Sequence, residues 1–244
     1  MSINNEVKGG KEYGRIMLHH FELDRRIGGL PYPTLTLIEG ENDSGKSVFV
    51  QQVAYGAVKD GFRVRYITTE NTIKSLLRHM ENLNFRVITE FLTGKLRVTE
   101  LQVLNLSWNR IISRRYLALL LRLIERDVKS DVYIVDSLTY IATHASSKDL
   151  LEFFTMMRNI VDDNDKAVFI TLHPDAFSDD LLIRIRSISG GHIILKTVES
   201  GGRMVRIINI NKLRGSERST NLIISFEVDP AFGIKILPFS QAKA

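Results

Sequence analysis

The chain has 244 residues, and its 33 Lys and Arg residues against 28 Asp and Glu residues give a formal net charge of +5 with neutral histidine. A chain of this length can bury a large apolar core in one domain, so its fold requires no disulfide or metal. Cysteine is absent, which excludes disulfides, thiolate zinc sites, iron–sulfur clusters and cysteine nucleophiles and fits a reducing cytoplasm. The longest apolar run, residues 117–121, ends at Arg122 and is far too short to span a membrane, so we expect a soluble protein.

The ends of the chain and its positive charges say little about function. Residues 1–14 carry charged side chains and no apolar stretch, which predicts a flexible arm and not a signal peptide, followed by one domain over residues 15–244. Positive charges are scattered along the chain, and four of them form the densest cluster: Arg110, Arg114, Arg115 and Arg122. Such a cluster on a helix is more often a solvated face than a phosphate-binding stripe.

Apolar runs that predict strands alternate with amphipathic patterns that predict helices over the first 172 residues. The predicted strands span residues 34–39, 62–69, 96–101, 132–135 and 167–172. The predicted helices span residues 45–61, 73–83, 107–128 and 146–160, the last with Ser146 or Ser147 as its cap. This alternation is typical of an α/β fold with a mainly parallel sheet flanked by helices.

The pattern changes after His192. Residues 193–198 and 204–210 predict two strands joined by a glycine turn, and further strands are predicted at 222–228 and 233–237. Hairpin-like spacing predicts that these C-terminal strands form an antiparallel edge. Because no repeat or flexible linker interrupts the chain, we expect one continuous sheet.

A phosphate-binding motif lies between the first predicted strand and helix. Residues 40–47 match G-x-x-x-x-G-K-[ST] without a gap, and the alternative, a glycine turn with an exposed lysine, does not require the strand and helix that flank it here. Backbone N–H groups at the positive end of the helix would bind the phosphates, the lysine would reach the β and γ phosphates, and the serine would bind Mg²⁺. The predicted nucleotide-binding residues are Asn42, Asp43, Ser44, Gly45, Lys46, Ser47 and Val48.

Two carboxylates follow predicted strands and should face the same crevice. Asp136 follows the apolar run 132–135 and is the candidate second Mg²⁺ ligand, through water; it could also cap the turn that begins at Ser137, and the two roles are compatible. Glu70 follows the strand that ends at Thr69 and is the candidate general base for the attacking water. Its alternative role is that of an acidic residue favoured at a helix N-terminus.

The order of these motifs resembles that in RecA-superfamily ATPases of the KaiC-like branch. The resemblance rests on the opening segment 23–31, the P-loop, the strand that ends at Glu70, the strand that ends at Asp136, and residues 211–215. Within that branch, one domain with Thr-Glu-Asn at 69–71 and Thr-Leu-His-Pro at 171–174 is similar to the ATP-binding accessory proteins of the archaeal flagellum (archaellum) motor. The resemblance implies a RecA-like P-loop fold and ATP with Mg²⁺ as ligands.

The resemblance also implies roles for residues outside the P-loop. Many KaiC-like members have two adjacent glutamates where this chain has Glu70 and Asn71, so the loss of the second one predicts slow hydrolysis. Lys212 and Arg214 match a Lys-x-Arg pair that reaches the γ-phosphate of a neighbouring subunit, although they could be plain surface charges. His173 matches a polar sensor position, or it is only part of the local structure before Pro174.

The function expected from the resemblance is that of a regulatory ATP-binding ring, with a hexamer favoured, that hydrolyses ATP slowly or not at all. Its expected partners are the archaellum motor/secretion ATPase and membrane-associated motor scaffold proteins, at the cytoplasmic face of the membrane. The alternative is a RecA/RadA-like recombination ATPase that acts on DNA, because the core fold is shared and the chain is basic. Against it, a helix-hairpin-helix module is lacking and the segment after Pro174 is acidic, so direct nucleic-acid binding is not expected. A clock-like kinase would have two tandem domains.

Overall fold

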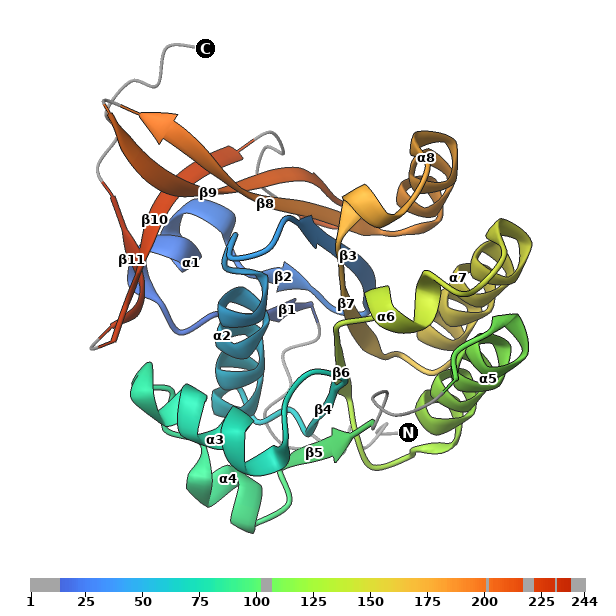
Figure 1. The fold of residues 1–244 in the computed structure, drawn as a ribbon. Helices are drawn as coiled ribbons and strands as arrows, with labels where there is room; N and C mark the ends of the chain where they lie inside the picture. Colours follow the sequence, from blue (N-terminus) through green and yellow to red (C-terminus); the bar gives the residue numbers. More distant parts are fainter. Residues whose placement is uncertain (1–13, 102–106, 201, 217–221, 231, 238–244) are drawn as a thin grey trace, which may run out of the picture.

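The computed structural model describes residues 14–101, 107–200, 202–216, 222–230 and 232–237, and its centre is a nine-stranded sheet (Figure 1). The strand order is β11-β10-β9-β8-β3-β7-β6-β4-β5. The strands are β3 Thr34–Gly40, β4 Val64–Thr68, β5 Leu96–Glu100, β6 Val132–Asp136, β7 Ala167–Leu172, β8 Gly191–Ser200, β9 Arg203–Leu213, β10 Leu222–Asp229 and β11 Gly233–Ile236. A separate two-stranded sheet pairs β1 Arg15–Ile16 with β2 Leu30–Pro31.

Helices cover both faces of the nine-stranded sheet (Figure 1). One face carries α1 Phe21–Ile27, α2 Lys46–Lys59 and α3 Ile73–Asn82, with α4 Ile88–Leu92 next to β5. The other face carries α5 Arg110–Arg126, α6 Thr139–Ala142, α7 Ser147–Asp163 and α8 Asp179–Ile188. No helix in the described ranges is long and apolar enough to cross a membrane.

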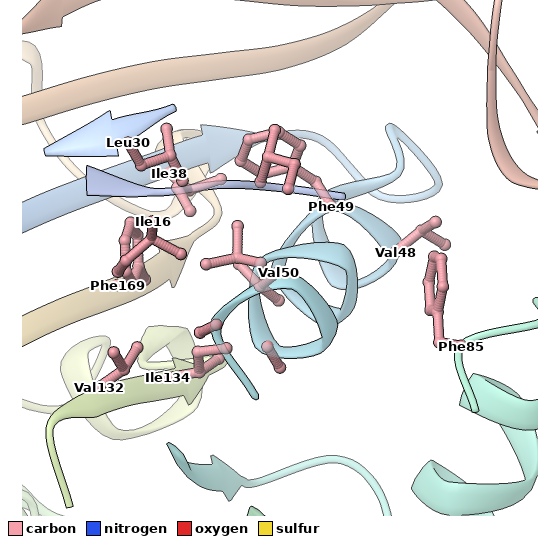
Figure 2. Close-up of a cluster of buried hydrophobic side chains, with 14 of the residues drawn as sticks. Ile16, Leu30, Ile38, Val48, Phe49, Val50, Phe85, Val132, Ile134 and Phe169 are labelled. Carbon is pink, nitrogen blue, oxygen red and sulfur yellow. The ribbon is translucent and has the colours of Figure 1, made fainter. Parts of the chain in front are cut away.

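Each face of the sheet has its own apolar core because side chains alternate along the buried strands. Ile134 of β6 packs in the core under α2, whereas its neighbour Val135 packs in the core under α5 and α7. Figure 2 shows the first core, with Val50 of α2 close to Ile38 and Phe169 of the sheet. Strands buried on both faces explain the wholly apolar run of β6 and confirm its assignment as a central strand.

The α/β fold with a mainly parallel sheet and antiparallel C-terminal strands is confirmed, with two corrections of detail. Strand β8, which begins at Gly191, pairs in parallel with β3, so the antiparallel part begins at β9 and not at residue 193. Glycine is needed at 191 because a Cβ there would lie 2.3 Å from the Oγ1 of Thr36 on β3. The second correction is that β9 is an internal strand between β8 and β10, although residues 211–213 extend past the β10 register.

The predicted helices correspond to α2, α3, α5 and α7, with ends within three residues of the predicted ones, whereas α1, α4, α6 and α8 were not predicted. Helix α5 begins at Arg110, three residues later than predicted, because the Asn109 side chain caps the N–H groups of Ile111 and Ile112. Ser146 is the cap of α7, in a capping box with Asp149. Helix α8 was not predicted and provides the crossover from β7 to the parallel strand β8. Of the predicted arm, residues 1–13 lie outside the described residues.

Candidate nucleotide-binding site

The P-loop connects the end of β3 to the start of α2, as the motif predicts, and its two glycines have no room for a side chain. A Cβ on Gly40 would lie 2.2 Å from the carbonyl oxygen of Leu195. Gly45 has a φ of 94°, and a Cβ there would lie 2.8 Å from the ring of Phe226 on β10. Residues of β8 and β10 therefore pack directly against Gly40 and Gly45, and a larger residue at either position would displace the loop.

A cavity of about 530 Å³ opens where α2 begins. Most of the predicted site residues line it: Asn42, Asp43, Gly45, Lys46, Ser47, Val48, Glu70, Asp136 and His173. Ser44 does not, because it is fully buried and its hydroxyl donates to the Glu41 carbonyl at 2.8 Å. The remaining cavity residues were not predicted: His79, Ser137, Arg206 and Val228.

The ammonium of Lys46 is held inside the P-loop. Its Nζ donates to the carbonyl oxygen of Glu41 at 2.5 Å, and only 6% of the residue is exposed. Burial lowers the pKa of Lys46, while the negative charges of Asp136 and Glu70 oppose that change. A phosphate group in the cavity would supply the negative charge that the buried ammonium lacks.

Ser47 and Asp136 come together from α2 and β6 at the bottom of the cavity. The Ser47 hydroxyl donates to Asp136 Oδ1 at 3.3 Å, and the same oxygen accepts a hydrogen bond of 2.8 Å from Thr171. The other oxygen, Oδ2, accepts a hydrogen bond of 2.6 Å from Tyr66. This arrangement fits Mg²⁺, which is commonly bound by one carboxylate and a hydroxyl and completed by phosphate oxygens and water. The described part of the chain has no cluster of three or more acidic, His or Cys residues that could hold a metal ion.

Glu70 lies just beyond the end of β4 and extends into the same cavity, whereas Asn71 does not line it. Burial and the negative charge of Asp136 raise the pKa of Glu70, and Lys46 opposes that change. The Asn71 side chain instead accepts a hydrogen bond of 3.4 Å from Ser75, at the start of α3. Of these two adjacent residues only Glu70 lines the cavity, and its role as general base stays a prediction.

His173 follows β7 and lies half-buried on the cavity wall. Its backbone N–H donates to Thr139 Oγ1 at 3.0 Å, which ties it to the segment after Asp136. Burial lowers the pKa of His173, and the charge of Lys46 lowers it further. His173 lines the cavity, and its sensor role stays a prediction.

Lys212 and Arg214 lie outside this cavity. The Nζ of Lys212 donates to carbonyl oxygens at the end of α8, at 2.6 Å for Ser189 and 3.2 Å for Arg186. Arg214 is exposed, and its guanidinium has no hydrogen bond or ion pair among the residues that the structure describes. A role in a neighbour's site stays a prediction for both residues.

Arg206 is the cavity residue that sequence reasoning missed most clearly. It lies on β9, and its Nε donates to the carbonyl oxygen of Asp43 in the P-loop at 2.8 Å. Asp43 has a φ of 57°, in the left-handed region that few non-glycine residues adopt. Only the position of β9 relative to the P-loop brings these residues together, and no local pattern signals it.

Comparison with known proteins agrees with this geometry. The family described as "ATPase: KaiC" matches residues 20–241. The archaeal flagellar ATP-binding protein FlaH of Sulfolobus acidocaldarius is 35% identical over 91% of this chain and 96% of its own length. FlaH of Methanocaldococcus jannaschii is 28% identical over 93% of this chain and 97% of its own length.

One solved structure and one more distant relative were also matched. The crystal structure of the flagellar accessory protein FlaH from M. jannaschii has a TM-score of 0.78 to this chain and covers 93% of it, with 100% of the crystallised chain matched. The circadian clock protein KaiC3 of Synechocystis is 26% identical over 85% of this chain but matches over 41% of its own length. From the family match over residues 20–241 and the identity to FlaH proteins over nearly their full length, we conclude that the chain belongs to the KaiC family of ATPases and, within it, to the FlaH group of archaeal flagellar ATP-binding proteins.

Proposed function

We propose that this chain binds Mg·ATP in the cavity at the start of α2, hydrolyses it slowly, and forms a nucleotide-dependent ring in the archaellum motor. The observation that carries the proposal is the meeting of Lys46 with the Ser47–Asp136 pair in one cavity that Glu70 also lines. Lys46 and the P-loop N–H groups would bind the triphosphate. Mg²⁺ would neutralise the phosphate charge next to Asp136.

Slow hydrolysis follows from what surrounds the attacking water. Glu70 is the carboxylate that we assign as base, and burial together with the negative charge of Asp136 raises its pKa. Asn71 cannot accept a proton and its amide is engaged with Ser75. In addition, no cation from a neighbouring subunit is present in a monomer. We therefore expect turnover well below the roughly 1–10³ s⁻¹ of ordinary enzymes.

Ring formation would complete the site through Arg214. Its exposed guanidinium is free to contact the γ-phosphate bound by a neighbour, with Lys212 beside it. If that contact exists only in the oligomer, linkage requires ATP to favour the oligomer and ADP to favour it less. One charge-assisted hydrogen bond of about 1.5–3 kcal/mol corresponds to about a 10- to 100-fold change in the association constant.

The proposed partners rest on the resemblance to archaellum proteins and not on any contact described above. The FlaH relatives are named for ATP binding in the archaeal flagellum. For this chain, we propose a hexameric ring at the cytoplasmic face of the membrane that docks on the motor ATPase and its membrane-associated scaffold. The alternative of a DNA recombination ATPase has no support among these relatives.

The test is the size of the purified protein, measured by light scattering or native mass spectrometry with ATP, with ADP and without nucleotide. ATP should increase the oligomer more than ADP does. Arg214→Ala and Lys46→Ala should each abolish the ATP effect, whereas Arg115→Ala, which removes another exposed arginine, on α5, should not. If the oligomer size did not depend on ATP, or if neither substitution changed the ATP effect, the proposed nucleotide-dependent ring would be refuted.

A further inference from the structure

We infer that Tyr66 is a positioning residue for Mg²⁺, because its buried hydroxyl fixes the orientation of the Asp136 carboxylate. The inference rests on the proposed function, in which Asp136 acts toward Mg²⁺. Tyr66 was not among the predicted site residues, and it does not line the cavity.

The two strands that flank β6 each hold one oxygen of Asp136. On one side, Tyr66 of β4 donates to Oδ2 at 2.6 Å. On the other side, Thr171 of β7 donates to Oδ1 at 2.8 Å. All three residues are buried, with exposed fractions of 0% for Tyr66 and Thr171 and 3% for Asp136. The carboxylate is thus held from both sides and presents Oδ1 to Ser47 at the cavity.

Packing alone does not account for a tyrosine at this position. A phenylalanine would fill the same core space, whereas a buried hydroxyl costs free energy unless it is hydrogen-bonded. The hydroxyl of Tyr66 has a charged acceptor. By contrast Tyr133, a fully buried tyrosine on the adjacent strand, donates to the backbone carbonyls of Asp127 and Ser130 at the opposite end of β6.

Residues that orient a metal-binding group from behind affect metal affinity strongly. Loss of such a partner typically lowers metal affinity about 10- to 100-fold. Without the Tyr66 hydroxyl, Oδ2 of Asp136 would be buried without this donor, and the carboxylate would be held only through Oδ1. The loss should therefore appear in the Mg²⁺-dependent part of ATP binding and not in the contacts of the triphosphate with Lys46 and the P-loop.

The experiment is calorimetric titration of the full chain with ATP, with and without Mg²⁺. Tyr66→Phe should reduce the gain in ATP affinity that Mg²⁺ provides by about 10-fold or more and leave the affinity without Mg²⁺ unchanged. Thr171→Val should act in the same direction. The matched control, Tyr133→Phe, should keep the full gain, because its hydroxyl lies away from Asp136.

A double substitution separates positioning from a general effect on structure. In the background of Asp136→Asn, Tyr66→Phe should cause no further loss, because it acts through Asp136. The inference is overturned if Tyr66→Phe keeps the wild-type gain from Mg²⁺, weakens ATP equally without Mg²⁺, or remains harmful beside Asp136→Asn. A wild-type protein with no gain from Mg²⁺ would instead refute the proposed function, and the inference with it.

Discussion

Replacement of Arg186 by methionine should strongly destabilise the protein, because it leaves a buried carboxylate without its main partner. Glu39 lies at the end of β3, directly before the P-loop, and is 1% exposed. Arg186 of α8 donates to its two oxygens at 2.8 Å and 2.6 Å, a bidentate pair. His192 of β8 lies 3.4 Å from the same carboxylate and is, among the described residues, the other titratable group that contacts it.

Removal of one member of a buried ion pair typically costs about 3–5 kcal/mol. We expect about 3 kcal/mol for Arg186→Met, the lower end of that range, because 32% of the Arg186 side chain is exposed and His192 remains. The cost arises from the uncompensated charge of Glu39. Therefore Glu39→Gln combined with Arg186→Met should recover most of the lost stability.

The pH dependence of the loss has a definite sign. Burial acts to raise the pKa of Glu39, but the hydrogen bonds and charges of Arg186 and His192 outweigh it and lower the pKa. In the wild type, this stabilisation is present above the unfolded-state pKa of about 4.3 and is lost as the pH falls. In Arg186→Met, burial dominates and the pKa rises above that value. Stability then decreases as the pH increases, so the two proteins differ more at pH 7 than at pH 4.

The assay is urea unfolding of both proteins without nucleotide between pH 4 and pH 7. Arg184→Met is the matched control on the same helix, since Arg184 forms an exposed ion pair with Asp180 that should contribute less than about 1 kcal/mol. A loss under 1 kcal/mol for Arg186→Met, or a loss that does not depend on pH, would refute this reasoning. A double variant no more stable than the single one would refute it as well.

Two further substitutions test the cavity itself. Lys46→Ala should abolish useful Mg·ATP binding in calorimetry while the unfolding transition without nucleotide remains cooperative, because its ammonium offsets the charge of the triphosphate; an unchanged affinity would contradict the P-loop assignment. Glu70→Gln should remove the residual hydrolysis measured by phosphate release. In the wild type that hydrolysis should decline as the pH falls through the raised pKa of Glu70, and equal rates in the two proteins would exclude Glu70 as the base.

Local sequence patterns were sufficient to predict the parts of the site that lie on consecutive elements. The P-loop is defined by residues 40–47 alone, and its flanking strand and helix follow from hydrophobic periodicity. Asp136 was predicted because it ends a wholly apolar strand, and parallel strands bring their carboxyl ends to one edge. The structure places it 3.3 Å from Ser47, although 89 residues separate the two in sequence.

Features that depend on strands far apart in the sequence could not be predicted in the same way. Tyr66 and Thr171 look like ordinary strand residues, and only the order β7-β6-β4 brings both hydroxyls to Asp136. Arg206 reaches the P-loop because β9 and β10 lie beyond β8 in the sheet. Helix α8 was missed because Asp179 and Asp180 made the segment after Pro174 look like an acidic loop. Both residues lie in the first turn of the helix, where the helix dipole favours negative charge.

Lys212 and Arg214 belong to one family motif, but their side chains have different surroundings in this structure. The resemblance gives Lys212 and Arg214 one shared role, but the ammonium of Lys212 already binds carbonyl oxygens at the negative end of α8. A contact with a neighbour's phosphate would require Lys212 to give up or share these hydrogen bonds, which would leave the end of α8 without its cation. Arg214 has no such bonds to lose among the described residues. For this reason substitution of Arg214 is a clean test of the proposed ring, whereas substitution of Lys212 would also weaken the helix that holds Arg186 against Glu39.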